Sequence, residues 1–161
     1  TTLMIRNLPH QLMQSDIIQE LDRSGFTGLY DFLYMPSAFS TGHGKGYAFI
    51  NFESTEAADA FVRAWQKSLR FGMTPNSHAL NISQASVQGR DKNIKQWDVP
   101  RMRRVKNPNF RPLIVVKSEG SSKQLLVPNP NAGARPGSSA GPDVHHVSRR
   151  SRQQRSQPRG R

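Results

Sequence analysis

The feature that most constrains this chain is an alternating stretch at residues 45–52, Lys-Gly-Tyr-Ala-Phe-Ile-Asn-Phe. In an extended strand, successive side chains point to opposite faces of the sheet. One face then carries small or apolar groups that can pack on helices: Gly46, Ala48, Ile50 and Phe52. The opposite face carries Lys45, Tyr47, Phe49 and Asn51. Two aromatic rings beside a cation are unusual on a plain solvent face, and they suit the recognition of unstacked bases and phosphates.

Further elements are predicted on both sides of this stretch. Hydrophobic periodicity and turn residues predict strands at residues 2–8, 29–35, 45–52 and 78–83. Apolar stripes at helical spacing predict one helix at residues 14–24 and a second that begins after Ser54. The resulting order is strand, helix, strand, strand, helix, strand. It predicts an α+β, ferredoxin-like split βαβ fold: a four-stranded antiparallel sheet with two helices on one face and the other face free.

The orientation of the second strand stays open at this stage, because both of its faces are apolar. One face of residues 29–35 carries three aromatic rings, and the other carries Asp31, Leu33 and Met35. The carboxylate of Asp31 favours this second face as the outward one. The aromatic face of residues 45–52 favours the opposite orientation, in which the rings of both strands share the outer surface.

Charge divides the chain into three parts. The 161 residues carry a formal net charge of +12, which suggests a polyanionic partner such as nucleic acid or an acidic membrane. Residues 1–89 hold six basic and seven acidic groups, residues 90–116 eight and two, and residues 117–161 nine and two. We expect a nearly neutral module at 1–89 and a basic extension packed on it at 90–116. Residues 117–161, rich in Arg, Ser, Gly and Pro, predict a disordered basic tail.

Several functional classes are disfavoured by composition. There is no apolar run long enough for a transmembrane helix. The absence of Cys excludes disulfides and thiolate metal sites and fits an intracellular protein. The five His residues show no metal-ligand spacing, and no nucleophile has a neighbouring base, so we expect no enzymatic activity, no metal and no cofactor. Because the chain begins with Thr1 rather than Met, we expect it to be cut from a longer protein.

Two motifs resemble those of the RNA-recognition motif. Residues 45–52 match its eight-residue motif at every position: basic, Gly, aromatic, Gly or Ala, aromatic, aliphatic, any, aromatic. Residues 3–8, Leu-Met-Ile-Arg-Asn-Leu, match the six-residue companion motif, except that Met4 stands where an aromatic residue is usual. A methionine thioether can still pack against a base, although with less specific geometry.

Beyond these motifs, the chain resembles the C-terminal RNA-recognition motif of the Mei-two-like proteins, a eukaryotic family tied to meiosis and differentiation. The resemblance covers about residues 1–116 and rests on residues 2–9, 30–36, 46–52, 85–89 and 111–113. It implies single-stranded RNA binding by the sheet and an extension that belongs to the fold. It also implies a regulator of messenger or non-coding RNA, and it makes Met4 a shared family feature.

On this basis we expect RNA contacts on the sheet and on the extension. Tyr47 and Phe49 would stack on bases, or one of them on a ribose, with Met4 packed alongside. Lys45 and Arg6 would meet phosphates or base edges, although ordinary solvated charges are an equally good interpretation. The other candidate RNA-binding residues are Asn7, Tyr34, Arg101, Arg103 and Arg104. The basic run at residues 101–106 is also typical of a nuclear localisation signal or of a solvated basic face.

The expected partner is single-stranded RNA, with protein partners possible and no membrane contact. We expect a monomer in the nucleus, the cytoplasm or both.

The extension leaves a second interpretation open. Trp97 would either pack the extension on the domain or act as a lid or an extra stacking ring. If the extension covers Tyr47 and Phe49, the module would bind proteins instead of RNA. Protein-binding variants of this fold usually have an acidic first helix and an Arg-x-Phe loop. Here the first helix is acidic, but Arg70 and Phe71 lack the intervening residue, and the aromatic rings of the strand are intact.

Overall fold

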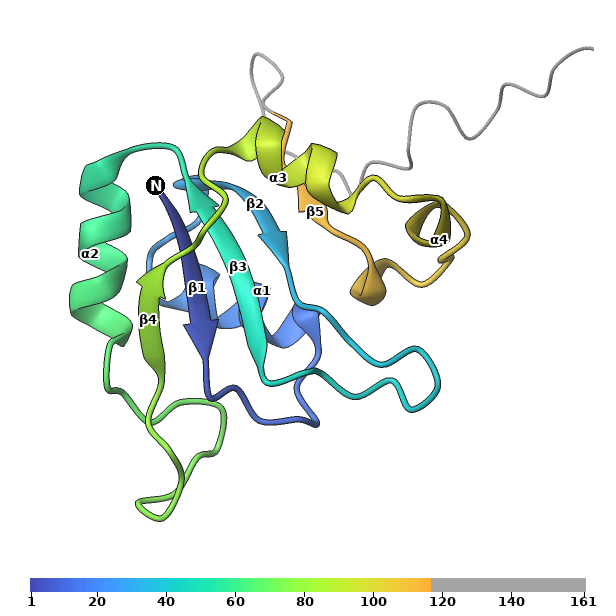
Figure 1. Ribbon diagram of the computed structural model, residues 1–161. Helices are drawn as coiled ribbons and strands as arrows, with labels where there is room; N and C mark the ends of the chain where they lie inside the picture. Colours follow the sequence, from blue (N-terminus) through green and yellow to red (C-terminus); the bar gives the residue numbers. More distant parts are fainter. Residues whose placement is uncertain (117–161) are drawn as a thin grey trace, which may run out of the picture.

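A single antiparallel sheet organises the protein. The computed structural model describes residues 1–116, so the predicted tail at 117–161 lies outside the described part. Within residues 1–116, five strands lie in the spatial order β4-β1-β3-β2-β5 (Figure 1). The strands are β1 Thr2–Arg6, β2 Tyr30–Tyr34, β3 Tyr47–Phe52, β4 Asn81–Gln84 and β5 Leu113–Ile114. The long central strands β1 and β3 pair along their whole length, which places the 45–52 stretch in the middle of the sheet.

Two helices cover one face of the sheet and form the core with it. They are α1 Gln14–Arg23 and α2 Thr55–Trp65. Ile17 from α1 and Phe61 from α2 pack with Ile5 and Ile50 of the central strands, and all four side chains are fully buried. This arrangement confirms the ferredoxin-like split βαβ fold. None of the helices in the described part is long and apolar enough to cross a membrane.

The predicted alternation in the 45–52 stretch is confirmed. Ala48, Ile50 and Phe52 are buried in the core, whereas Tyr47 and Phe49 lie on the opposite face and are partly exposed. The regular strand begins only at Tyr47, because the preceding Gly46 adopts a left-handed backbone (φ 80°) that favours glycine.

The orientation of the second strand is settled by a β-bulge. The pairing of β2 with β3 shifts between Tyr30 and Phe32, so Tyr30, Leu33 and Met35 all belong to the core. Phe32 and Tyr34 therefore share the outer face with the rings of β3. The argument from Asp31 was wrong, because the bulge breaks the alternation on which it relied. The Asp31 carboxylate lies near the outer face, where it accepts a hydrogen bond from the Asn51 amide at 2.7 Å.

The sheet has one strand more than predicted, because the extension adds β5 to its edge. Ile114 of β5 lies opposite Phe32 of β2, and the Val115 N–H donates to the Asp31 carbonyl at 3.0 Å. The apolar run near the end of residues 111–116 indicates an extended segment, but a two-residue strand leaves too little periodic signal to predict that it joins the sheet. The buried Gln14 side chain secures this edge, since its Nε2 donates to the Arg111 carbonyl at 2.9 Å and its Oε1 accepts from the Met35 N–H at 3.0 Å.

The rest of the extension begins over the outer face and continues beside the sheet, where its last helix contacts α1. It comprises α3 Arg90–Trp97, α4 Pro100–Arg103 and a short 3₁₀ helix, η1 Pro108–Phe110. Figure 1 shows α3 crossing above the upper end of β2, with α4 to the right of the sheet. The chain thus leaves β4, crosses the outer face and returns to the edge of β2 with which β5 pairs.

A buried polar network attaches the start of α3 to the sheet. The Thr2 hydroxyl donates to Asn51 Oδ1 at 2.6 Å and accepts from the Gly89 N–H at 2.8 Å. Asn93 Nδ2 donates to the carbonyls of Gly89 and Val87, at 2.8 and 3.2 Å, and contacts the Thr2 hydroxyl at 3.4 Å. Thr2 and Asn93 are 0% and 1% exposed. Buried polar groups are costly when unpaired, so this network holds α3 in one position.

We predict that Asn93→Ala destabilises the domain by about 1–3 kcal/mol, because it removes the side-chain donor of the Val87 carbonyl and the amide that lies against the buried Thr2 hydroxyl. Urea unfolding of the full chain measures this change. Lys92→Ala is the matched control, since Lys92 lies on the same helix and is exposed; its effect should stay within about 0.5 kcal/mol. Equal effects of the two substitutions would show that the network does not stabilise the fold.

Candidate nucleic-acid interface

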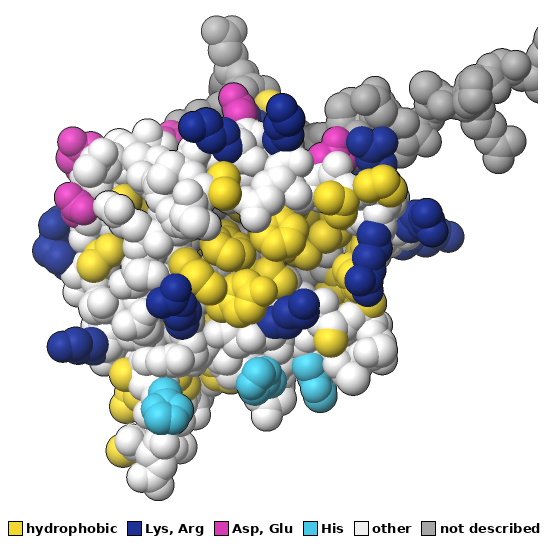
Figure 2. All heavy atoms as spheres, in the orientation of Figure 1, with side chains coloured by type: hydrophobic (Ala, Val, Ile, Leu, Met, Phe, Trp, Pro, Cys, Tyr) yellow, Lys and Arg dark blue, Asp and Glu magenta, His cyan; other side chains and the backbone are white. Residues whose placement is uncertain are grey.

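The outer face of the sheet brings five predicted residues into two adjacent rows. Strand register places Met4, Phe49 and Tyr34 side by side across β1, β3 and β2. Arg6 and Tyr47 form the next row. The rings of Tyr47 and Phe49 contact each other edge to face, with centroids 5.7 Å apart and planes at 80°. Figure 2 shows the result, a continuous hydrophobic patch with Lys and Arg side chains around it.

Trp97, at the end of α3, forms the β2 side of this patch. Its ring centroid lies 4.6 Å from that of Tyr34 and 6.0 Å from that of Phe49. Trp97 thus packs the extension on the domain and also extends the aromatic surface, since its own side chain stays partly exposed. The structure therefore confirms the packing role of Trp97, and a role as an extra stacking ring stays a prediction.

Tyr34 departs from its predicted role, because its side chain is only 3% exposed beneath the extension. Burial, together with the neighbouring Tyr47, raises the pKa of Tyr34 to about 12, while Arg101 opposes the rise. The phenol is therefore neutral at physiological pH. In this structure Tyr34 supports Trp97 from below and offers no surface on which a base can stack.

The extension covers only part of the outer face. At the end nearest α3, Thr2, Phe32 and Asn51 are buried, with exposures of 0%, 0% and 3%. Burial is the main cause that raises the pKa of the Asp31 carboxyl at this end of the sheet. On the β1 and β3 side, Met4, Tyr47 and Phe49 keep partial exposure, and Arg6 is exposed. Tyr47 and Phe49 of β3 are therefore the accessible rings of the sheet itself, whereas β2 and the end nearest α3 are covered.

The predicted basic residues of the extension have different surroundings. The Arg101 guanidinium stacks over the Phe39 ring at 4.6 Å. Arg103 pairs with Asp98 through two hydrogen bonds of 3.0 Å, which raise the pKa of Arg103. Arg104 is exposed at the end of α4. Arg101 and Arg103 thus also stabilise the extension, and Arg104 takes no part in these contacts.

An aromatic contact joins the extension to the loop between β2 and β3, and the sequence did not reveal it. The rings of Phe39 and Phe110 meet edge to face, with centroids 6.1 Å apart. Both residues lie in irregular segments far apart in the sequence, where no periodicity indicates a partner. Together with Arg101, they hold the loop against α4.

Asn7 and Lys45 lie at the end of the patch away from α3. Asn7 follows β1 with a left-handed backbone (φ 63°), which asparagine tolerates better than most residues. Its Nδ2 donates to the Ala79 carbonyl at 2.8 Å, so one role of Asn7 is to join two loops. Lys45 is exposed immediately before β3.

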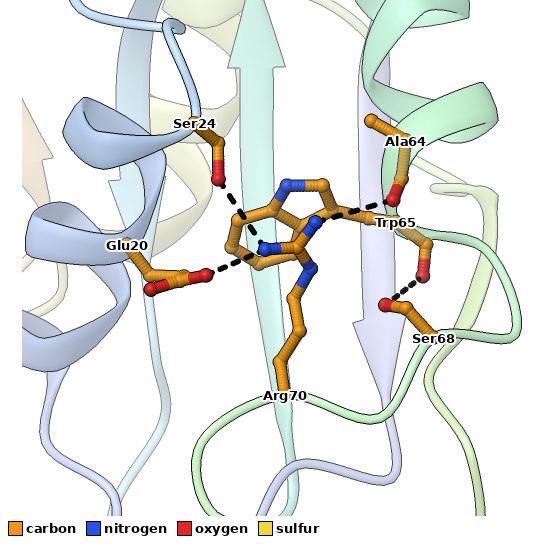
Figure 3. Close-up of polar contacts among 6 residues, drawn as sticks. All are labelled: Glu20, Ser24, Ala64, Trp65, Ser68 and Arg70. Atoms are coloured by element: carbon orange, nitrogen blue, oxygen red, sulfur yellow. Dashed lines mark hydrogen bonds and ion pairs between the residues drawn. The ribbon is translucent and has the colours of Figure 1, made fainter.

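On the helical side of the domain, Arg70 is engaged by residues of α1 and α2. The Arg70 guanidinium lies 4.5 Å from the centroid of the buried Trp65 ring and pairs with Glu20 of α1 (Figure 3). It also donates to the Ser24 hydroxyl and the Ala64 carbonyl, at 3.3 and 3.2 Å. The acidic helix and the Arg-containing loop, which resembled a protein-binding module, are therefore engaged with each other.

Comparison with known proteins agrees with this geometry. The family model described as RNA recognition motif 2 matches residues 1–98. The chain is 32% identical over 130 residues to the meiosis protein mei2 of Schizosaccharomyces pombe, a match that covers 81% of this chain and 17% of that protein. It is 31% identical over 109 residues to protein MEI2-like 6 of Oryza sativa subsp. japonica, covering 56% of this chain and 33% of that protein. The chain thus spans a third or less of each of these two relatives.

Among solved structures, the chain is similar to the RRM of Rna15 with bound GU RNA, at 24% identity and a TM-score of 0.46, covering 59% of this chain and 93% of that one. The resemblance to Mei-two-like proteins is confirmed by the family model and the curated relatives. RNA-recognition motifs are RNA-binding domains rather than enzymes, in agreement with the prediction of no catalysis. The chain belongs to the RNA recognition motif 2 family.

Proposed function

We propose that this domain binds single-stranded RNA on the exposed half of its outer face, with bases stacked on Tyr47 and Phe49. The observation that carries the proposal is the exposure of these rings: they stay accessible beside Met4 and Arg6 although the extension buries the β2 half of the sheet. Each base stacked on an aromatic ring contributes about 1–3 kcal/mol. Two such contacts supply a substantial part of a specific affinity.

Trp97 gives the proposed surface a boundary. It lies beside Phe49 and above Tyr34, so an RNA strand that crosses the patch meets a wall of the extension at β2. We infer that the extension completes the RNA surface on one side. The edge of the Trp97 ring would then contact the base or ribose that lies on Phe49.

Attraction to the phosphates comes mainly from outside the sheet. Residues 1–89 are nearly neutral, whereas residues 90–161 hold 17 basic and four acidic groups. Lys and Arg side chains surround the patch in Figure 2, so the RNA backbone has cations on several sides. We therefore propose that the rings of the sheet supply stacking and that the basic extension and tail supply most of the salt-dependent binding.

The rival interpretation, a protein-binding module with a covered sheet, has less support. Tyr47 and Phe49 are not covered by the extension in the described part of the chain. Arg70 and Glu20, which would serve a partner peptide, contact each other and the domain's own Trp65.

The biological process is inferred from the relatives. Because one relative is named a meiosis protein and the other a MEI2-like protein, we propose that this chain acts in RNA regulation during meiosis or differentiation. We further propose that it does so as a monomer, in the nucleus, the cytoplasm or both.

We predict that the double substitution Tyr47→Ala, Phe49→Ala weakens RNA binding at least about 30-fold, which corresponds to two lost stacking contacts of about 1 kcal/mol or more each. Fluorescence anisotropy with an RNA selected from a random pool measures the affinity. Thermal unfolding should change little, because both rings are partly exposed. Leu29→Ala, Leu69→Ala is the control, since both residues are exposed apolar groups outside the patch. If affinity survives the loss of both rings, the sheet is not the RNA platform.

Removal of residues 117–161 tests the division between stacking and charge. For single-stranded nucleic acid, the logarithm of the binding constant falls with the logarithm of salt concentration by about 0.7 per neutralised phosphate. The truncated chain should therefore show a flatter salt dependence and lower affinity at low salt. Random-pool selection on both forms should return the same RNA motif. A salt slope unaffected by truncation would contradict the proposed role of the tail.

A further inference from the structure

A hollow of about 380 Å³ opens at the end of the patch opposite α3. Its walls come from the segment after β1, from the residues just before β3, and from the connection between α2 and β4. The side chains that define its chemistry are Asn7, His10, Lys45, Met73, Ser77 and His78. All nine residues that line it are neutral or potentially cationic, with no carboxylate among them. A site of this composition favours a ligand with a negatively charged group.

The hollow directly adjoins the proposed RNA surface. Asn7 follows Arg6 at the end of β1, and Lys45 precedes Tyr47 by two positions. Arg6 and Tyr47 lie opposite each other and form the last row of the patch before the hollow. Histidine side chains lie along the lower rim of the same face in Figure 2. A nucleotide stacked on Tyr47 therefore has a neighbour position over the hollow.

The other borders of the patch direct an RNA strand toward this end. The β2 side is closed by Trp97, and the upper end is closed by α3, which the network around Thr2 and Asn93 holds in place. Figure 1 shows the extension at the top and right of the sheet, and the loops that form the hollow at the bottom. The open sides are thus the β4 side and the end with the hollow.

The walls of the hollow are fixed by hydrogen bonds between loops. Asn7 ties the end of β1 to the Ala79 carbonyl, and the Leu8 N–H donates to the Gly46 carbonyl at 3.0 Å. The His10 Nδ1 lies 2.9 Å from the Gly44 carbonyl; since a carbonyl can only accept, Nδ1 donates, and the ring orientation is set. A site with preset walls loses little entropy when a ligand enters.

We propose that this hollow is a further nucleotide subsite, which takes the nucleotide next to the one stacked on Tyr47. Its volume lies at the lower end of the range of ligand pockets, about 300–1,000 Å³, and is sufficient for one nucleotide. The imidazole of His78 and the thioether of Met73 offer surfaces for a base, and Ser77 offers a hydroxyl for its polar edge. Lys45 meets the connecting phosphate. This inference rests on the proposed function, since the sheet must deliver the strand.

The methionines provide a direct test, because they report on separate regions. Met4 lies on the patch, Met73 in the hollow, Met102 in α4, and Met13 is exposed at the start of α1. The full chain with isotope-labelled methionine methyl groups is titrated with random-sequence RNA pools of two and of eight nucleotides. We expect the two-nucleotide pool to shift the Met4 methyl signal alone. The eight-nucleotide pool should shift both Met4 and Met73 and leave Met13 unchanged.

The outcomes separate this inference from the proposed function. A shift at Met4 without one at Met73, in the eight-nucleotide pool, overturns the subsite and leaves binding by the sheet intact. A shift at Met73 without one at Met4 contradicts stacking on the sheet, and it also overturns the subsite as the neighbour of a nucleotide stacked on Tyr47. If neither signal moves, both proposals are overturned.

A pair of histidine substitutions gives an independent measurement. His78→Ala should weaken binding of the eight-nucleotide pool about fivefold, as expected for one modest stacking contact of about 1 kcal/mol, and leave the two-nucleotide pool unaffected. His43→Ala is the matched control, since His43 is also exposed but lies outside the hollow. If the two variants bind the eight-nucleotide pool equally well, His78 does not contact RNA and the subsite is overturned.

Discussion

The structure depends most on the buried hydrogen bonds that attach α3 to the outer face of the sheet. The Thr2 hydroxyl links β1 to Asn51 of β3 and to the Gly89 backbone at the start of α3, and Asn93 closes the network from the helix. Because each buried polar group is costly when unpaired, the helix cannot leave without exposing several of them. The extension and the sheet therefore act as one unit, and the position of Trp97 follows from this attachment.

This attachment also decides how much of the sheet can contact a ligand. The face opposite the helices would be open in a plain four-stranded fold, but here the β2 half is buried and Tyr34 supports Trp97. What remains is a narrow aromatic surface with an indole wall on one side and a hollow with basic and polar walls at one end. Because the module has almost no net charge, we propose that RNA binding combines stacking on these rings with cations contributed by the later part of the chain.

The sequence predicted those parts that follow a regular period. Alternation alone identified Tyr47 and Phe49 as outward rings, and helical spacing identified both core helices. It failed where the backbone leaves its regular period. The bulge beside Asp31 defeated one of the two arguments about the face of β2, and the two-residue strand β5 was too short for its pairing with the sheet to be predicted. The argument from the aromatic face of residues 45–52 correctly placed Tyr34 with the other outward rings. The burial of Tyr34 depends on a helix more than fifty residues later in the chain, which no local pattern reports.

We propose that the extension completes the RNA surface and stays attached to the sheet when RNA binds. Tryptophan fluorescence tests it directly, because Trp65 lies in the core and Trp97 lies on the patch. Titration of the full chain with RNA should change the emission intensity without shifting it to the red, and Trp97→Phe should abolish the change. A red shift toward the emission of a fully solvated indole would show that Trp97 leaves the sheet to admit RNA. That result would exclude an extension that stays attached to the sheet during RNA binding.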